Sequence, residues 1–331
     1  MEADIVDLIG NTPLIKLKYP SEITGCNIYG KAEFLNPAGS VKDRAALGII
    51  LEAEKNKEIE KGGTLVEGTF GNTGIAFAMI NNARGYKTII VMPDNASNEK
   101  RDILRNMGAD LKIVESLPYS DSGNYQHVSR KLALELNEKN GGNVIWGNQF
   151  DNIANYKFHE STTAQEILNQ TEGKIDGFTC AIGTGGTLSG VSVGIKQKNK
   201  NIKVACSDPQ GARMYNYFKH GKLEEKGDPS ETEGIGQYRI TKNVEPSLID
   251  MSYHITDYEA FDLLYKLVKT DGLFLGTSCG VNIAGAIKMA KDMGPGKNIV
   301  TILCDDANKY YSKMFNKDFL QSKKLPIPEW I

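Results

Sequence analysis

Lys42 stands where a lysine side chain can act as a nucleophile. The segment from Ser40 to Asp43 places an acid three residues after a serine, a pattern that resembles the capping box at the start of a helix. Lys42 would then lie at a helix N-terminus, where the positive end of the helix dipole disfavours an ammonium group. A neutral lysine amine can form a Schiff base with a carbonyl compound. The alternative is an ordinary solvated lysine.

Glycine-containing turns precede four of the predicted helices. Glycine lets a backbone turn sharply and approach a bound group closely, and the free N–H groups at a helix start attract anions. The four turns are residues 36–44, 67–74, 183–190 and 276–280. The chain has 34 glycines among 331 residues, whereas an average usage of about 7% would give about 23. Several such turns together predict a site with phosphate and carboxylate contacts.

A reactive lysine beside a phosphate-binding turn is the combination that pyridoxal phosphate requires. Other motifs fit less well. A dinucleotide fingerprint that starts at Gly183 needs glycine where the chain has Leu188, and a nucleotide-binding P-loop is absent from the sequence. Residues 276–280 match the G-x-S-x-G elbow of α/β-hydrolases, but that fold needs a histidine after Ser278, and the last histidine is His254. The turn that begins at Gly183 therefore predicts a cradle for a single phosphate group.

Composition excludes several classes of partner. Lysine and arginine total 39 and aspartate and glutamate total 41, so the net charge of −2 gives no field that attracts nucleic acid or an anionic membrane. No run of 18 apolar residues predicts a transmembrane helix. The first residues lack the basic region of a secretory signal, so we expect a cytoplasmic protein. Five scattered cysteines and four histidines without ligand spacing predict reduced thiols and no metal site.

The elements that must position these residues alternate along the chain. Short apolar runs rich in β-branched residues predict strands at 88–92, 111–115, 176–182, 202–207 and 298–304. Amphipathic stretches predict helices at 44–61, 72–84, 98–107, 122–139, 154–170, 187–198, 258–270 and 281–293. Residues 210–247 predict a loop around a site. This alternation favours an α/β fold with mainly parallel sheets and helices on both faces.

Taken together, these motifs resemble those of the fold-type II pyridoxal-phosphate enzymes of the cysteine synthase and cystathionine β-synthase family. The resemblance runs from about residue 9 to 315 and rests on GSVKDR at 39–44, GNTG at 71–74 and GTGGT at 183–187. It implies an α/β protein of two three-layer α/β/α domains of the tryptophan-synthase-β-like type. A small domain of residues 45–150 would be inserted in a large cofactor-binding domain of residues 1–44 and 151–331. A homodimer is usual in this family.

The resemblance also implies roles for individual residues. Lys42 would bind the cofactor, pyridoxal 5'-phosphate, as a Schiff base and would move the Cα proton of the substrate. Asn72 would hydrogen-bond the ring hydroxyl of the cofactor, and Ser278 would face its pyridine nitrogen. The cofactor phosphate would be held by Gly183, Thr184, Gly185, Gly186 and Thr187. The carboxylate of the amino-acid substrate would be bound by Thr69, Asn72, Thr73 and Gln149, with Phe70 beside the substrate.

The implied reaction is β-replacement or β-elimination through an α-aminoacrylate. The β-substituent of cysteine, serine or O-acetylserine leaves, an α-aminoacrylate remains, and a nucleophile adds at Cβ. A hydroxyl such as that of Ser278 does not hold a proton on the pyridine nitrogen, which favours prompt loss of the β-substituent over transamination.

Some positions depart from the usual cysteine synthase pattern. Phe70 replaces a common serine and either lines the substrate pocket or packs between the domains. Glu233 stands where cysteine synthases tend to have glutamine, and an acid there is similar to cystathionine β-synthases and some cysteine lyases. Its carboxylate would deprotonate a thiol or a water molecule. Alternatively, Glu233 is solvated or paired with Arg239. Tyr238 and Arg239 have no assigned role.

Glu233 decides which reaction the sequence predicts. A carboxylate that activates a thiol helps to release sulfide from cysteine, whereas it would repel bisulfide, the anionic nucleophile of a cysteine synthase. We therefore expect a cysteine lyase that releases hydrogen sulfide, with Glu233 and Lys42 as catalytic residues. A cysteine synthase that uses O-acetylserine and a cystathionine β-synthase-like enzyme are the alternatives. A serine or threonine dehydratase fits the glycine motifs less well, and a non-enzymatic binding protein is disfavoured because Lys42, Asn72 and Ser278 are all present.

Overall fold

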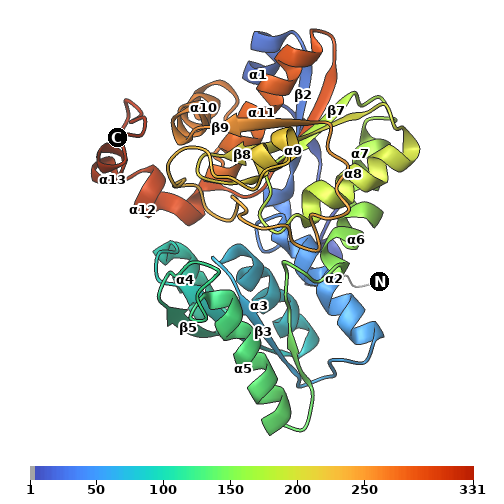
Figure 1. The fold of residues 1–331 in the computed structure, drawn as a ribbon, viewed down its shortest axis with the longest axis vertical. Coiled ribbons are helices and arrows are strands. Elements are labelled where there is room, and N and C mark those ends of the chain that lie inside the picture. Colours follow the sequence, from blue (N-terminus) through green and yellow to red (C-terminus); the bar gives the residue numbers. More distant parts are fainter. Residues whose placement is uncertain (1–3) are drawn as a thin grey trace.

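The computed structural model describes residues 4–331 and contains two mainly parallel sheets with helices on both faces (Figure 1). Its strands are β1 (Leu14–Lys16), β2 (Asn27–Ala32), β3 (Thr64–Gly68), β4 (Lys87–Pro93), β5 (Asp110–Val114), β6 (Val144–Trp146), β7 (Gly177–Cys180), β8 (Lys203–Pro209), β9 (Met251–Ile255) and β10 (Asn298–Leu303). Its α-helices are α1 (Lys18–Thr24), α2 (Lys42–Lys55), α3 (Asn72–Arg84), α4 (Asn98–Asn106), α5 (Tyr125–Lys139), α6 (Ala154–Ser161), α7 (Thr163–Gln170), α8 (Gly186–Lys198), α9 (Met214–His220), α10 (Asp257–Thr270), α11 (Thr277–Met293), α12 (Tyr311–Met314) and α13 (Lys317–Ser322). Short 3₁₀ helices are η1 (Ile5–Leu8), η2 (Glu33–Leu35) and η3 (Ala307–Tyr310).

The larger sheet combines strands from distant parts of the chain. Its order is β1-β2-β10-β7-β8-β9. β1 runs antiparallel to β2, and the other neighbouring pairs in this sheet are parallel. The segments that follow β2, β7, β8 and β10 therefore leave the sheet at the same edge. Ligands of open α/β sheets bind at this carboxyl edge.

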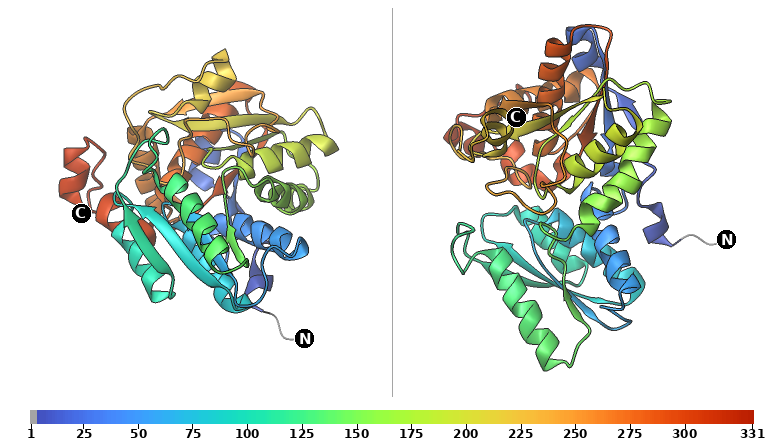
Figure 2. Two further views of the ribbon diagram at one scale, coloured as in Figure 1. Left: turned by 60° about the horizontal axis from the view of Figure 1, so that its bottom comes forward. Right: turned by 45° about the vertical axis from the view of Figure 1, so that its right-hand side comes forward.

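The smaller sheet is continuous in sequence. Its order is β5-β4-β3-β6, and all its neighbouring strands are parallel. Figure 2 shows the unit around this sheet beside the unit around the larger one. α2 packs against α3 of the smaller unit and against α6 of the larger unit. We call these the smaller and larger units, and the domain boundaries near residues 45 and 150 stay a prediction.

Successive residues of the central strands enter hydrophobic clusters on opposite faces of each sheet. In β10, Ile299 packs with α10 and α11, whereas Val300 packs with α7 and α8. In β3, Leu65 packs with α2 and α3, whereas Val66 packs with α5. Alternate side chains of a strand point to opposite faces. Each sheet therefore has a buried helical layer on both sides, and the predicted α/β class with mainly parallel sheets is confirmed.

The predicted elements differ from the observed ones where local pattern and tertiary packing conflict. The predicted strands coincide with β4, β5, β7, β8 and β10. β2 and β3 escaped prediction because each contains a buried charged residue, Lys31 or Glu67. The helix predicted at 44–61 ends at Lys55, since Lys57 has a φ of 59° that a right-handed helix excludes. The helix predicted at 154–170 is divided into α6 and α7 at Thr162.

The described part of the chain offers no membrane span and no metal cluster. Within residues 4–331, no helix is long and apolar enough to cross a membrane. The same residues contain no group of three or more His, Cys, Asp or Glu side chains that would hold a metal ion. The five cysteines are free thiols, and Cys304 is the least buried of them.

Candidate active site

Lys42 is the first residue of α2, as predicted. Its backbone N–H donates to Ser40 Oγ over 3.2 Å. The reciprocal contact of a capping box is not made, because the Asp43 carboxylate accepts the backbone N–H of Ala38 at 2.7 Å instead. Burial raises the pKa of Asp43 to about 7. The Lys42 side chain itself is half-buried.

A buried ion cluster fixes the first turn of α2 to the larger unit. Arg44 Nε lies 2.7 Å from Glu33 Oε2, and Arg44 Nη1 lies 2.7 Å from Glu166 Oε1. Lys31 Nζ, from β2, lies 2.6 Å from Glu166 Oε2. The Arg44 side chain is fully buried. Because Arg44 is two residues from Lys42, this cluster determines where Lys42 stands.

A cavity at the carboxyl ends of β7 and β10 brings Lys42 together with the predicted phosphate turn. It is lined by Val41, Lys42, Cys180, Ala181, Gly183, Thr184, Gly185, Thr187, Ile235, Ile302 and Cys304. None of these lining residues carries a carboxylate. The sequence assigned no role to Ile235, which lies in the motif EGIG at 233–236, or to Cys304, which ends a predicted strand.

The turn after β7 leads directly into α8. This helix begins at Gly186, so its first N–H groups have no acceptor within the helix. Thr184 Oγ1 accepts a hydrogen bond from Asn155 Nδ2 at 2.9 Å. A Cβ on Gly183 would lie 2.3 Å from the backbone oxygen of Gly234, so only glycine fits at this position. The turn is thus held between α6 and the loop that carries Glu233.

His159 supports the same turn from α6. Its Nε2 lies 3.2 Å from Thr187 Oγ1, and its Nδ1 lies 2.8 Å from Thr163 Oγ1. Burial lowers the pKa of His159 well below its usual value, so the ring is neutral. Its role escaped prediction because the sequence shows only a lone histidine within a predicted helix.

The predicted substrate-binding residues meet at the start of α3. Thr73 Oγ1 donates to Gln149 Oε1 at 2.7 Å, and Gln149 Nε2 donates to the carbonyl of Gly68 at 3.2 Å. Thr69 Oγ1 accepts the backbone N–H of Gly71 at 3.1 Å. The three side chains are buried. N–H groups at a helix start, with hydroxyl and amide groups beside them, suit a carboxylate.

Asn72 and Ser278 stand at the starts of α3 and α11. Asn72 Nδ2 donates to Asp305 Oδ2 at 2.7 Å, and its Oδ1 is buried without a hydrogen-bond partner among the residues that the structure describes. Ser278 is buried in the first turn of α11. Asp305 Oδ2 also accepts the hydroxyl of Tyr310 at 2.5 Å. No motif of the sequence connected Asp305 or Tyr310 to the site.

Glu233 is buried in an ion cluster. Lys100 Nζ, from α4 of the smaller unit, donates to Glu233 Oε2 at 2.7 Å, and Lys313 Nζ, from α12, lies 2.7 Å from Glu233 Oε1. Burial tends to raise the pKa of Glu233, but the two ammonium groups outweigh it and lower the pKa. The alternative of a solvated residue or of a pair with Arg239 is wrong, because Arg239 Nη2 lies 2.8 Å from Asp151 Oδ2. The catalytic role of Glu233 stays a prediction.

Phe70 packs inside the smaller unit rather than between the two units. Its ring meets that of Tyr125 edge-on, with centroids 5.4 Å apart, and it contacts the cluster that contains Ile90 and Leu104. Its place beside the substrate stays a prediction. Tyr238 is exposed, with the guanidinium of Arg213 5.8 Å from its ring centroid.

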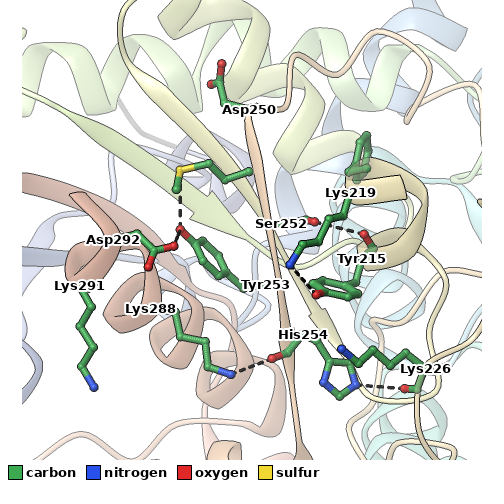
Figure 3. Close-up of a pocket in the computed structure, with 12 residues that line it drawn as sticks. Tyr215, Lys219, Lys226, Asp250, Ser252, Tyr253, His254, Lys288, Lys291 and Asp292 are labelled. Carbon is green, nitrogen blue, oxygen red and sulfur yellow. Dashed lines mark hydrogen bonds between the residues drawn. The ribbon is translucent and has the colours of Figure 1, made fainter. Parts of the chain in front are cut away.

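A larger open groove lies along the edge of β9. Its volume is about 640 Å³. Figure 3 shows β9 between α11 and the segment that carries Tyr215, with lysines on both sides: Lys219, Lys226, Lys288 and Lys291. Lysines beside a sheet edge discourage pairing with a strand of another molecule. None of the predicted site residues lines this groove, so the Lys42 cavity is the candidate active site.

The Lys42 cavity fits the cofactor that the resemblance implies. Lys42 supplies the amine, while the start of α8 and the hydroxyls of Thr184 and Thr187 supply donors for a phosphate. The absence of a lining carboxylate removes a source of repulsion for that phosphate. Neither Asn72 nor Ser278 lines this cavity, but Asn72 Oδ1, at the start of α3, has no hydrogen-bond partner within the described residues.

Comparisons with known proteins agree with this fit. A family model described as "Pyridoxal-phosphate dependent enzyme" matches residues 5–305. A cysteine synthase from Emericella nidulans is 45% identical over 325 residues, which cover 97% of this chain and 86% of that protein. The structure of an O-ureido-L-serine synthase has a TM-score of 0.84 and 32% identity, covering 97% of this chain and 99% of that one. A hydrogen sulfide-producing enzyme from Fusobacterium nucleatum has a TM-score of 0.82 and 35% identity, covering 94% and 100%.

Proposed function

The chain belongs to the pyridoxal-phosphate-dependent enzymes and, within them, to the cysteine synthase family, and we propose that it makes cysteine from O-acetylserine and sulfide. Sulfide would replace the acetoxy group at Cβ, and acetate would leave. The observation that carries this proposal is the cavity that contains both Lys42 and the phosphate turn, in a chain 45% identical to a cysteine synthase. The comparisons favour this reaction over the cysteine lyase that the sequence predicts.

The chain's own residues would hold the cofactor in three places. The turn from Gly183 to Thr187 would bind the phosphate through the N–H groups at the start of α8. Asn72 would contact the ring hydroxyl, and Ser278 would face the pyridine nitrogen. When bound, pyridoxal phosphate supplies a carbonyl for the substrate amine and a sink for the electrons of the Cα–H bond.

Lys42 would move the proton. As a neutral amine it takes the proton from Cα of the substrate, and the electron pair of that C–H bond allows acetate to leave from Cβ. The half-buried side chain lines the cavity and can reach a group bound there. After the sulfur has added at Cβ, Lys42 returns a proton to Cα and cysteine is released.

The start of α3 would hold the substrate carboxylate. Thr69, Thr73 and Gln149 already contact one another or the same turn, so they can receive a carboxylate with little rearrangement. The helix dipole adds to the attraction. These contacts would orient Cα toward the amine of Lys42.

The ion cluster around Glu233 supports sulfide as the nucleophile. Glu233 carries one negative charge, but Lys100 and Lys313 together carry two positive charges within 2.7 Å. The cluster as a whole does not repel bisulfide as an isolated carboxylate would. The lowered pKa also makes Glu233 a weaker base toward a thiol.

Release of hydrogen sulfide from cysteine is the second candidate function. It is favoured by the likeness to the hydrogen sulfide-producing enzyme and by the presence of an acid at position 233. For this reaction Glu233 would have to accept a proton, which its two lysine partners disfavour because they lower its pKa. If the lyase reaction dominates, Glu233→Gln should reduce sulfide release more than cysteine formation.

Product analysis tests the proposal. The protein loaded with pyridoxal phosphate is incubated with O-acetylserine and sulfide, and cysteine and acetate are measured. We expect both products in equal amounts, since each added sulfur displaces one acetate. Acetate without cysteine would contradict the proposal, because it would indicate elimination instead of replacement.

The arrangement of the two units leads to a further part of the proposal. Residues 45–150 would form a small domain that closes over the substrate and excludes water. The enzyme would be a cytoplasmic homodimer, which size-exclusion chromatography with light scattering would test by its mass.

A further inference from the structure

We propose that Lys100 is a positioning residue that fixes the substrate-binding turn at 69–73 against the larger unit. The inference rests on the proposed function, because that proposal assigns the turn to the amino-acid substrate. Lys100 lies in α4 and is 1% exposed, and its aliphatic stem and its ammonium group contact different parts of the site. No motif of the sequence pointed to it.

The stem of Lys100 covers the middle of the turn. A Cβ on Gly71 would lie 2.5 Å from Lys100 Cδ and 2.9 Å from Lys100 Cβ. Gly71 has a φ of +135°, a conformation that other residues rarely adopt. The stem therefore occupies the space of the missing side chain and holds the turn in this conformation. Thr69 and Thr73 flank Gly71, so their positions depend on the same contact.

The ammonium group of Lys100 ties the turn to the larger unit. Lys100 Nζ donates to Glu233 Oε2 at 2.7 Å and lies 4.1 Å from the ring centroid of Tyr310. Tyr310 donates to Asp305, which accepts from Asn72 at the other end of the turn. The turn is thus joined to the larger unit at two points, and Tyr310 contacts both.

The substitution Lys100→Met separates the contact with Gly71 from the ion pair with Glu233. The unbranched methionine side chain can still cover Gly71, but it cannot bind Glu233. Glu233 would keep the ion pair with Lys313, so the substitution leaves no unpaired buried charge. Removing one partner of a buried ion pair is costly chiefly because it leaves the other charge unpaired, and Lys313 prevents that for Glu233. Lys100→Met should therefore fold, and it should lack mainly the ion pair between α4 and Glu233.

Substrate binding tests the proposal directly. Alanine, which has the same amino and carboxylate groups but no β-substituent that can leave, is titrated into the protein loaded with pyridoxal phosphate, and the change in visible absorption gives a dissociation constant. Loss of a hydrogen bond between charged groups should raise this constant about tenfold in Lys100→Met. KM for the amino acid should rise similarly and kcat should change less. A second substitution, Glu233→Gln, should add little to Lys100→Met, because both remove the same pair.

Lys112→Met is the matched control, since Lys112 forms an exposed ion pair with Asp110 in the same unit. Its dissociation constant should equal that of the unaltered protein. A folded Lys100→Met protein whose constant stays within about twofold contradicts the proposal. If Lys100→Met fails to fold, an unchanged constant in Glu233→Gln contradicts it instead. Binding of alanine without cysteine formation from O-acetylserine would contradict only the proposed function, and a protein that does not respond to alanine is titrated with cysteine.

Discussion

Single side chains carry the proposed chemistry, and their surroundings determine which of them are charged. Glu233 is buried between Lys100 and Lys313, and its pKa is lowered. Glu67 is buried in β3, one of its carboxyl oxygens has no hydrogen-bond partner among residues 4–331, and burial raises its pKa to about 8. Burial also keeps the His159 ring neutral, because it lowers the pKa of the imidazole well below its usual value. The pKa of Glu233, which is buried beside two cations, is therefore lowered, whereas the pKa of Glu67, which is buried without a cation, is raised.

Lys42→Ala tests the residue on which the chemistry depends. We expect loss of the visible absorption of the lysine-bound cofactor and a fall in cysteine formation of at least about 10³-fold, since the base is removed. Lys57→Ala, an exposed lysine after α2, serves as the control and should change neither. Survival of the absorption band in Lys42→Ala would disprove the assignment.

Glu67→Gln tests the raised pKa through stability. Between the ordinary value of 4.5 and about 8, the unfolded chain loses the Glu67 proton while the folded protein keeps it. This contribution to stability is complete below pH 4.5 and is lost as the pH rises toward 8. Glutamine does not titrate. Between pH 5 and pH 8, the free energy of unfolding of the variant should therefore increase by at least about 1.4 kcal/mol relative to that of the parent.

Urea unfolding at the two pH values measures this gain. Glu138→Gln, at an exposed position of α5, is the control and should show no such gain. If the free energies of unfolding of Glu67→Gln and the parent differ by the same amount at both pH values, the pKa of Glu67 is not raised.

At the scale of elements, helix starts place most of the site. α2 begins at Lys42, α3 begins at Asn72 and α8 begins at Gly186. Each start lies at a glycine-containing turn, and each turn is held by side chains from other elements. The start of α2 depends most on such support, because Arg44 and Glu33 are both fully buried there.

Arg44→Met tests that support. Glu33 would lose its ionic partner while staying buried, so we expect a loss of about 3–5 kcal/mol in the free energy of unfolding. Arg105→Met removes an exposed pair with Asp102 and should cost less than about 0.5 kcal/mol. Urea denaturation compares the two, and equal losses would show that the cluster does not stabilise α2.

The sequence predicted these helix starts because each has a local signature. Glycine, serine and asparagine at fixed spacing identify the turns before α2, α3 and α8, and they led to Lys42 and the phosphate turn. The elements that it missed lack such signatures. β3 has only two large apolar residues, Leu65 and Val66, before Glu67 and Gly68, and only its burial between β4 and β6 explains why this segment is a strand.

At the scale of the whole molecule, the two units meet through contacts between distant parts of the chain. Lys100 and Glu233 are 133 residues apart, and Asn72 and Asp305 are 233 apart. No local pattern could predict these partners, because they depend on how the two sheets are placed. This is why the sequence identified Glu233 as unusual but suggested Arg239 as its ionic partner.

The position of Glu233 between two lysines also changes which reaction we expect. An isolated carboxylate at position 233 favoured a cysteine lyase, whereas a carboxylate between two ammonium groups is compatible with an anionic nucleophile. The two candidate reactions are therefore distinguished by which of them the enzyme performs more efficiently.

The direct test is to measure kcat/KM for both reactions with the same purified protein loaded with pyridoxal phosphate. One assay follows cysteine formation from O-acetylserine and sulfide, and the other follows sulfide release from cysteine. We expect cysteine formation to be at least about tenfold more efficient, a difference of about 1.4 kcal/mol in transition-state stabilisation. A higher kcat/KM for sulfide release would contradict it and identify the enzyme as a cysteine lyase.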